Sequence, residues 1–262
     1  MEATTIDGQK YLVPKLYLAN STLDGLLNQT NPVNNNIASN STIFAGRDLT
    51  LNIGKNLINT NSTILAKNNL NLTANNIINQ TTIGAVGSGK LFNSKSTIGS
   101  LTGNTNLTAL KALDGSGGNI INIGSSIKAG NNLTLVAGNN ITNKALVDYK
   151  INGTNYSNGN NLNDSGLSQI TINQTNTKRI GNGLKGIQTT TTQVNTTVED
   201  LVMNSNANNI KSTLLSQGNI ESGGNLVMVA GNNINNIASN IKAGGSALLQ
   251  ATDGNINRVL TS

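Results

Sequence analysis

A repeat of about 21 residues constrains the fold of this chain more than any other feature of its sequence. Its clearest copy is the stretch ILAKNNLNLTANNIIN, which begins at Ile64. An equivalent copy begins 21 positions earlier at Ile43, and others begin at Ile127, Ile220 and Ile241. Self-similarity at a fixed period of this length predicts an architecture in which each unit stacks on its neighbours and cannot bury its apolar face alone.

Within one unit, apolar and polar residues alternate as in a strand with one buried face. Leu133, Leu135 and Ala137 alternate with Thr134 and Val136, and a Gly-Asn-Asn corner and a short Ile-x-Asn strand follow. Gly and Asn both tolerate the left-handed backbone conformations that sharp corners require. No stretch shows a sustained 3.6-residue apolar period. Three short strands and three corners in about 21 residues therefore predict one coil of an all-β, parallel β-helix.

Asn is the most unusual part of the composition, with about fifty residues in a chain of 262. In stacked coils at a spacing of about 4.8 Å, Asn above Asn forms amide ladders and satisfies the backbone at the corners. We therefore expect nearly every Asn to be a corner or ladder residue. Leu, Ile, Val and Phe make up roughly a quarter of the chain and the net charge is only +6, so the composition predicts a folded chain with a core of small aliphatic side chains.

The repeat does not run through the whole chain. Ile127 and Ile220 are 93 residues apart, which is not a multiple of 21, so part of the chain must leave the stack. We predict a leading segment or cap at residues 1–36, β-helix repeats at 37–143 and at 218–262, and between them irregular coils with an extra-helical, Thr-rich hairpin or loop at 144–217. Nine to twelve coils would give an axis of roughly 45–60 Å.

The repeated pattern x-I-x-A-G-x-N-L-x-L-x-A-G-N-N-I resembles the filamentous-haemagglutinin repeat, best at residues 41–79, 120–143 and 218–257. That repeat builds the shafts of exoproteins exported by two-partner secretion, which include adhesins and the toxin carriers of contact-dependent growth inhibition. The resemblance implies a right-handed β-helix, as the handedness rule for parallel crossovers also favours. It further implies a secreted, extracellular or bacterial cell-surface location, and an outer-membrane transporter of the two-partner type as partner during export.

The chain departs from that family at both ends. Residues 1–20 lack the basic start and apolar core of a signal peptide, and only Asn31-Pro32-Val33-Asn34 comes near the motifs of the family's secretion domain. No VENN pre-toxin motif occurs. We therefore expect a segment of a longer chain that holds neither an export signal nor a toxic domain. No apolar run approaches the ~20 residues of a transmembrane helix, so none is expected.

The residue types for most enzyme chemistry are missing. The chain has no His and no Cys, which excludes an ordinary zinc site and His-dependent nucleophilic catalysis. The acids share no repeat position, whereas acid–base catalysis or calcium binding needs two or three carboxylates together. We therefore predict no enzyme activity, no cofactor and no metal site. Aromatic residues form only 2% of the chain, which leaves no stacking platform for a nucleic-acid partner.

The only local basic cluster lies within the predicted extra-helical stretch. It consists of Lys178, Arg179 and Lys185, and we name these residues as candidates for contact with a target-cell receptor or glycan. The sequence thus predicts a non-catalytic shaft that presents an adhesive or toxin-delivering part to other cells. Two alternatives remain open: a glycan-binding or glycan-processing β-helix, and a segment that itself contacts the target-cell surface through residues 144–217.

Overall fold

The chain forms two units, Met1–Asn40 and Ser41–Ser262, in the computed structural model. The structure describes residues 2–6, 9–13, 41–86, 89–92, 95–151, 154–157, 169–178, 188–197 and 210–259. In the first unit, β1 (Glu2–Ile6) and β2 (Gln9–Val13) pair as an antiparallel hairpin. The remaining described strands belong to the second unit.

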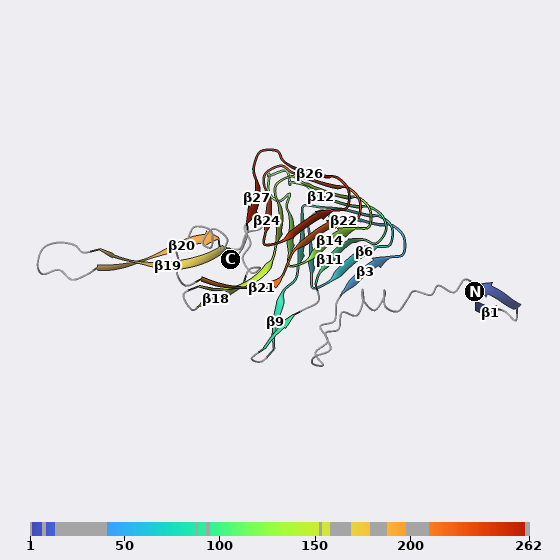
Figure 1. The fold of residues 1–262 in the computed structure, drawn as a ribbon, viewed down its shortest axis with the longest axis horizontal. Helices are drawn as coiled ribbons and strands as arrows, with labels where there is room; N and C mark the ends of the chain where they lie inside the picture. Colours follow the sequence, from blue (N-terminus) through green and yellow to red (C-terminus); the bar gives the residue numbers. More distant parts are fainter. Residues whose placement is uncertain are drawn as a thin grey trace, which may run out of the picture. The chain divides into compact units, whose positions relative to one another are not determined.

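Three parallel sheets of six strands each form the body of the second unit (Figure 1). Sheet I contains β3 (Thr42–Ala45), β6 (Thr63–Ala66), β11 (Thr97–Ser100), β14 (Ser126–Ala129), β22 (Asn219–Ser222) and β25 (Asn240–Ala243). Sheet II contains β4 (Leu49–Asn52), β7 (Leu70–Ala74), β12 (Thr105–Ala109), β15 (Leu133–Ala137), β23 (Leu226–Ala230) and β26 (Ala247–Ala251). Sheet III contains β5 (Asn56–Thr60), β8 (Asn76–Gln80), β13 (Ile120–Ile123), β16 (Ile141–Lys144), β24 (Ile234–Ile237) and β27 (Ile256–Val259).

Each coil contributes one strand to each sheet, in the order I, II, III. The strands of successive coils pair in register, so each side chain lies next to its repeat equivalent. No residue in the described ranges lies in a helix. The predicted all-β parallel β-helix with an extra-helical excursion is therefore confirmed.

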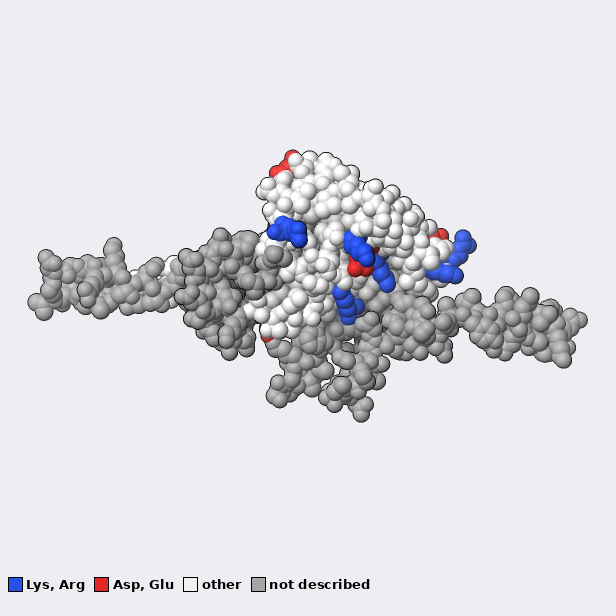
Figure 2. All heavy atoms as spheres, viewed as in Figure 1, with Lys and Arg blue, Asp and Glu red and all other residues white. Residues whose placement is uncertain are grey.

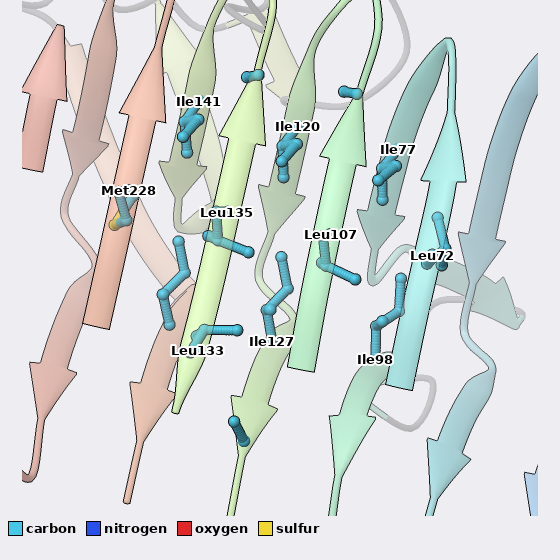
Figure 3. Packing of buried hydrophobic residues seen from close by; sticks show 14 of the residues in the cluster. Leu72, Ile77, Ile98, Leu107, Ile120, Ile127, Leu133, Leu135, Ile141 and Met228 are labelled. Atoms are coloured by element: carbon cyan, nitrogen blue, oxygen red, sulfur yellow. The ribbon is translucent and has the colours of Figure 1, made fainter. Parts of the chain in front are cut away.

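The core consists of columns of aliphatic side chains that run across the coils. Ile98 and Ile127 are neighbours in the column from sheet I, Leu107 and Leu135 in the column from sheet II, and all four are fully buried (Figure 3). Burial of such side chains contributes about 1.5–3 kcal/mol each. In β15, for example, the side chains of Leu133, Leu135 and Ala137 are buried and those of Thr134 and Val136 face outward. This is the alternation that the sequence predicts.

The third coil does not follow the repeat pattern, because its core departs from it. Thr105 occupies the position of Leu70 and Leu133, and it is completely buried. Its hydroxyl donates to the Lys128 carbonyl oxygen at 2.8 Å, so the buried polar group is satisfied.

The described residues form six coils, against the nine to twelve that the sequence predicts for the whole chain. Six strands at about 4.8 Å span about 24 Å. Ile64 and Ile127 are three periods apart in sequence, but only the coil of Ile98 lies between them. Insertions take up the rest of that length. One is the antiparallel hairpin of β9 (Ile83–Val86) and β10 (Gly89–Phe92), and the other is the loop 110–118 between β12 and β13.

A ladder of Asn side chains runs inside the stack at the corner between sheets III and I. Each amide donates to the Oδ1 atom of the next coil: Asn59 to Asn79 at 2.8 Å, Asn79 to Asn122 at 2.9 Å, Asn122 to Asn143 at 2.8 Å and Asn143 to Asn236 at 2.8 Å. The other N–H of each amide donates to a carbonyl oxygen of the corner backbone. Asn122, for example, donates to the Ser125 carbonyl oxygen at 2.9 Å. The amide ladders predicted from the composition are confirmed here.

The two other corners carry ladders of a second kind, in which an Asn Oδ1 accepts a backbone N–H from the next coil. Between sheets I and II, the N–H groups of Asn104, Asn132 and Asn225 donate to the Asn side chains one coil earlier, at 2.8–3.1 Å. Between sheets II and III, Asn140 accepts from the backbone N–H of Asn233 at 3.0 Å. Each ladder therefore supplies the hydrogen bonds that a corner cannot obtain from strand pairing.

One glycine position shows how closely the corners stack. A Cβ atom on Gly223 would lie 2.1 Å from the carbonyl oxygen of Gly130 in the preceding coil. A side chain at position 223 would therefore require one of the two backbones to shift.

Replacing Asn122 by Ala tests the internal ladder. The substitution removes two donated and one accepted hydrogen bond at a fully buried position, so the free energy of unfolding should fall by about 3–5 kcal/mol. Asn71→Ala is the matched control, because Asn71 is exposed and its Oδ1 accepts one bond, from Asn106 at 2.8 Å; this change should cost about 0.5 kcal/mol. Denaturant unfolding followed by circular dichroism measures both, and equal losses would contradict the ladder's role.

Candidate functional site

The excursion between the fourth and fifth coils packs a small antiparallel sheet against the stack. Strand β17 (Leu146–Ile151) pairs with β18 (Thr154–Ser157) on one side and with β21 (Ile210–Ser216) on the other. Leu146 packs with Ile121 and Ile123 on the outer face of sheet III, and Lys144 beside them is completely buried. This second apolar cluster fixes the base of the excursion to the coils.

Gly124 marks the place where the excursion meets the stack. It has a φ of +56°, and a Cβ atom there would lie 2.7 Å from Cβ of Leu146. Its carbonyl oxygen accepts a hydrogen bond from the Ser216 hydroxyl at 2.7 Å. Both the backbone conformation and the space therefore require glycine at this position.

A second antiparallel pair in the excursion forms a sheet of its own. Strand β19 (Gln169–Lys178) pairs over its whole length with β20 (Gln188–Thr197), which is the Thr-rich segment. The side chains of residues 190–193 are exposed. Both outer edges of this ribbon lack a further strand partner among the described residues.

Only one of the three basic candidates from the sequence lies within the described residues. Lys178 is the last residue of β19 and lies opposite Gln188. Arg179 and Lys185 lie outside the described residues. The contact role predicted for these three side chains therefore stays a prediction.

The four described acids that belong to the stack lie in different parts of it. Asp48 starts the ladder between sheets I and II, Asp114 closes a turn through the N–H and hydroxyl of Ser116, Glu221 lies on sheet I, and Asp253 lies at a corner of the last coil. In the part of the chain with described side chains, no three His, Cys, Asp or Glu residues lie close enough to hold a metal ion.

A group of charged residues that the sequence analysis did not identify lies on the outer face of sheet I. This sheet I charge cluster consists of Lys95, Lys128, Glu221 and Lys242. Strand pairing places Lys128 beside Glu221, and Glu221 beside Lys242. Figure 2 shows basic and acidic side chains next to one another over these strands. Lys128, Glu221 and Lys242 each follow the first Ile of a repeat copy, so an alignment of the copies could have found three of the four.

Partial burial acts on two of these lysines. It lowers the pKa of both Lys95 and Lys128, because the charged ammonium loses hydration, while the nearby Glu221 carboxylate acts in the opposite direction. Lys95 also contacts Asn219: when the amide is oriented to satisfy both groups, its oxygen accepts from Lys95 Nζ at 2.9 Å.

Comparison with known proteins gave no match to a family model, a curated protein or a solved structure. No helix long and apolar enough to cross a membrane occurs among the described residues.

Asp48 gives a pH-dependent test of how a ladder begins. Hydrogen bonds from the Asn69 side chain and backbone lower the Asp48 pKa, so its contribution to stability is present above the unfolded pKa of about 3.9 and is lost as the pH falls through the folded value. Below about pH 4, the melting temperature of the wild type should therefore fall relative to that of Asp48→Asn, because only the wild type loses the contribution of the Asp48 carboxylate. Asp253→Asn is the charge-matched control, and parallel pH profiles for wild type and Asp48→Asn would contradict this account.

Proposed function

We propose that this chain is a non-catalytic shaft segment of a large secreted or cell-surface bacterial exoprotein. Its role is to hold an adhesive or toxin-delivering part away from the cell that produces it. The observation that supports this most is the stack of coils: successive coils pair in register through columns of core side chains and ladders of Asn, so further coils can stack in the same way. The resemblance of the repeat to the filamentous-haemagglutinin pattern supports the same proposal.

The proposal includes a route and partners. Export would use an outer-membrane transporter of the two-partner type, and the full-length protein would meet a receptor or glycan on the target cell. Each coil that folds outside the cell buries its apolar columns on the previous one, and that free energy favours outward movement.

Export of a tagged chain tests the shaft proposal. The chain is placed between a two-partner secretion domain and an epitope tag, and it is expressed with the cognate transporter. We expect the tag to reach the cell surface on a protease-resistant stack. Leu135→Lys puts a charge at a fully buried core position and should reduce surface display strongly. Thr134→Lys, one residue away on the outer face, should leave display unchanged.

Retention of the tag inside the cell in the unmodified chain would contradict the proposal. Equal display of the Leu135→Lys and Thr134→Lys variants would show that coil folding plays no part in export.

A second candidate function is direct contact with the target cell through the excursion. The β19–β20 ribbon favours it, because this pair lies outside the three stacked sheets. Under this alternative, purified protein binds target cells saturably, and binding is lost when residues 169–197 are replaced by a short Gly-Ser linker. The shaft proposal alone predicts no difference between the two proteins, and the circular dichroism spectrum of the coils is the folding control.

A further inference from the structure

Lys95 reaches across one complete coil of the stack. It lies just before β11 in the third coil, and its contact partner Asn219 begins β22 in the fifth coil. Strand β14 of the fourth coil lies between them in sheet I. The Nζ atom of Lys95 is 2.9 Å from the amide oxygen of Asn219, whose nitrogen donates to the Gly218 carbonyl at 3.0 Å. A primary amine and a side-chain amide from distant parts of the sequence are therefore in direct contact.

Glu221 lies two residues after Asn219 in the same strand, and therefore on the same outer face of sheet I. Its carboxylate is close enough to interact electrostatically with Lys95 and with Lys128. Burial lowers the Lys95 pKa, which increases the fraction of the amine that is neutral and nucleophilic. An amine and an amide are thus in contact, and a carboxylate lies near them on the same face of the sheet.

We propose that Lys95 and Asn219 join in an intramolecular isopeptide bond, with Glu221 as the proton carrier. The lone pair of neutral Nζ attacks Cγ of Asn219, and the bond from Cγ to Nδ2 breaks. The carboxylate of Glu221 takes a proton from Nζ and passes it to the departing nitrogen, which leaves as ammonia. Amine and primary amide become a secondary amide and ammonia, so the step needs no oxidant or other co-reactant.

The position of this bond gives it a structural purpose. The chain leaves the stack after β16 and returns only at Asn219, so the whole excursion separates the fourth and fifth coils along the sequence. A bond from Lys95 to Asn219 connects the third coil to the fifth covalently, by a path that does not include the excursion. Pulling forces would then pass between these coils without passing through the excursion.

The intact mass of the purified chain tests the proposal. The wild-type protein should weigh about 17 Da less than its sequence, the mass of one ammonia. A tryptic digest should contain the Lys95 and Asn219 peptides as one linked species. Lys95→Arg keeps the charge but removes the reactive amine, and Asn219→Ala removes the amide, so each variant should have its full sequence mass. Glu221→Gln should lose most of the cross-link.

Two controls make the result decisive. Lys242→Arg changes a neighbouring lysine of the sheet I charge cluster and should keep the mass loss. Succinimide formation at another Asn also releases ammonia, but it gives no linked peptide and persists in Lys95→Arg. A wild-type mass equal to the sequence, or a mass loss that Lys95→Arg retains, would overturn the proposal. Complete cross-linking in Glu221→Gln would overturn the role of Glu221. Circular dichroism confirms that all variants are folded.

Discussion

The fold depends on hydrogen bonds that Asn side chains form between successive coils. At each corner the chain must turn sharply, and the corner backbone groups would lose hydration without gaining a strand partner. Asn solves this at all three corners, since its amide can donate to one coil, accept from another and bond the local backbone. The aliphatic columns provide most of the free energy of burial, but they do not by themselves specify which residue lies above which. The ladders set that register.

Most of this architecture could be predicted because it is local and repeated. The strands, the corners and the Asn ladders follow from a pattern that five copies share. A substitution in one copy therefore does not hide the pattern, because the other copies still show it. The coil of Ile98 was missed for two physical reasons. Thr105 replaces a core leucine by hydrogen bonding inside the stack, and two insertions disturb the period on either side of this coil.

The charged surface was less predictable than the core. Lys95 and Asn219 are 124 residues apart in sequence, and their contact depends on the exclusion of the excursion from the stack. The basic candidates Lys178, Arg179 and Lys185 were chosen because they are close in sequence, which is a weaker guide in a solenoid than a shared repeat position. In such a fold, side chains meet across coils more often than along the chain.

Hydrogen exchange at the corners tests the central role of the ladders most directly. The backbone N–H groups of Asn104, Asn132 and Asn225 lie at surface corners but donate to Asn side chains of the preceding coil. The account predicts that these amides exchange as slowly as those of the central strands β12 and β15, because both open only when the stack opens. Exchange of these corner amides at the rate of an unprotected surface loop, while β12 and β15 stay protected, would contradict it.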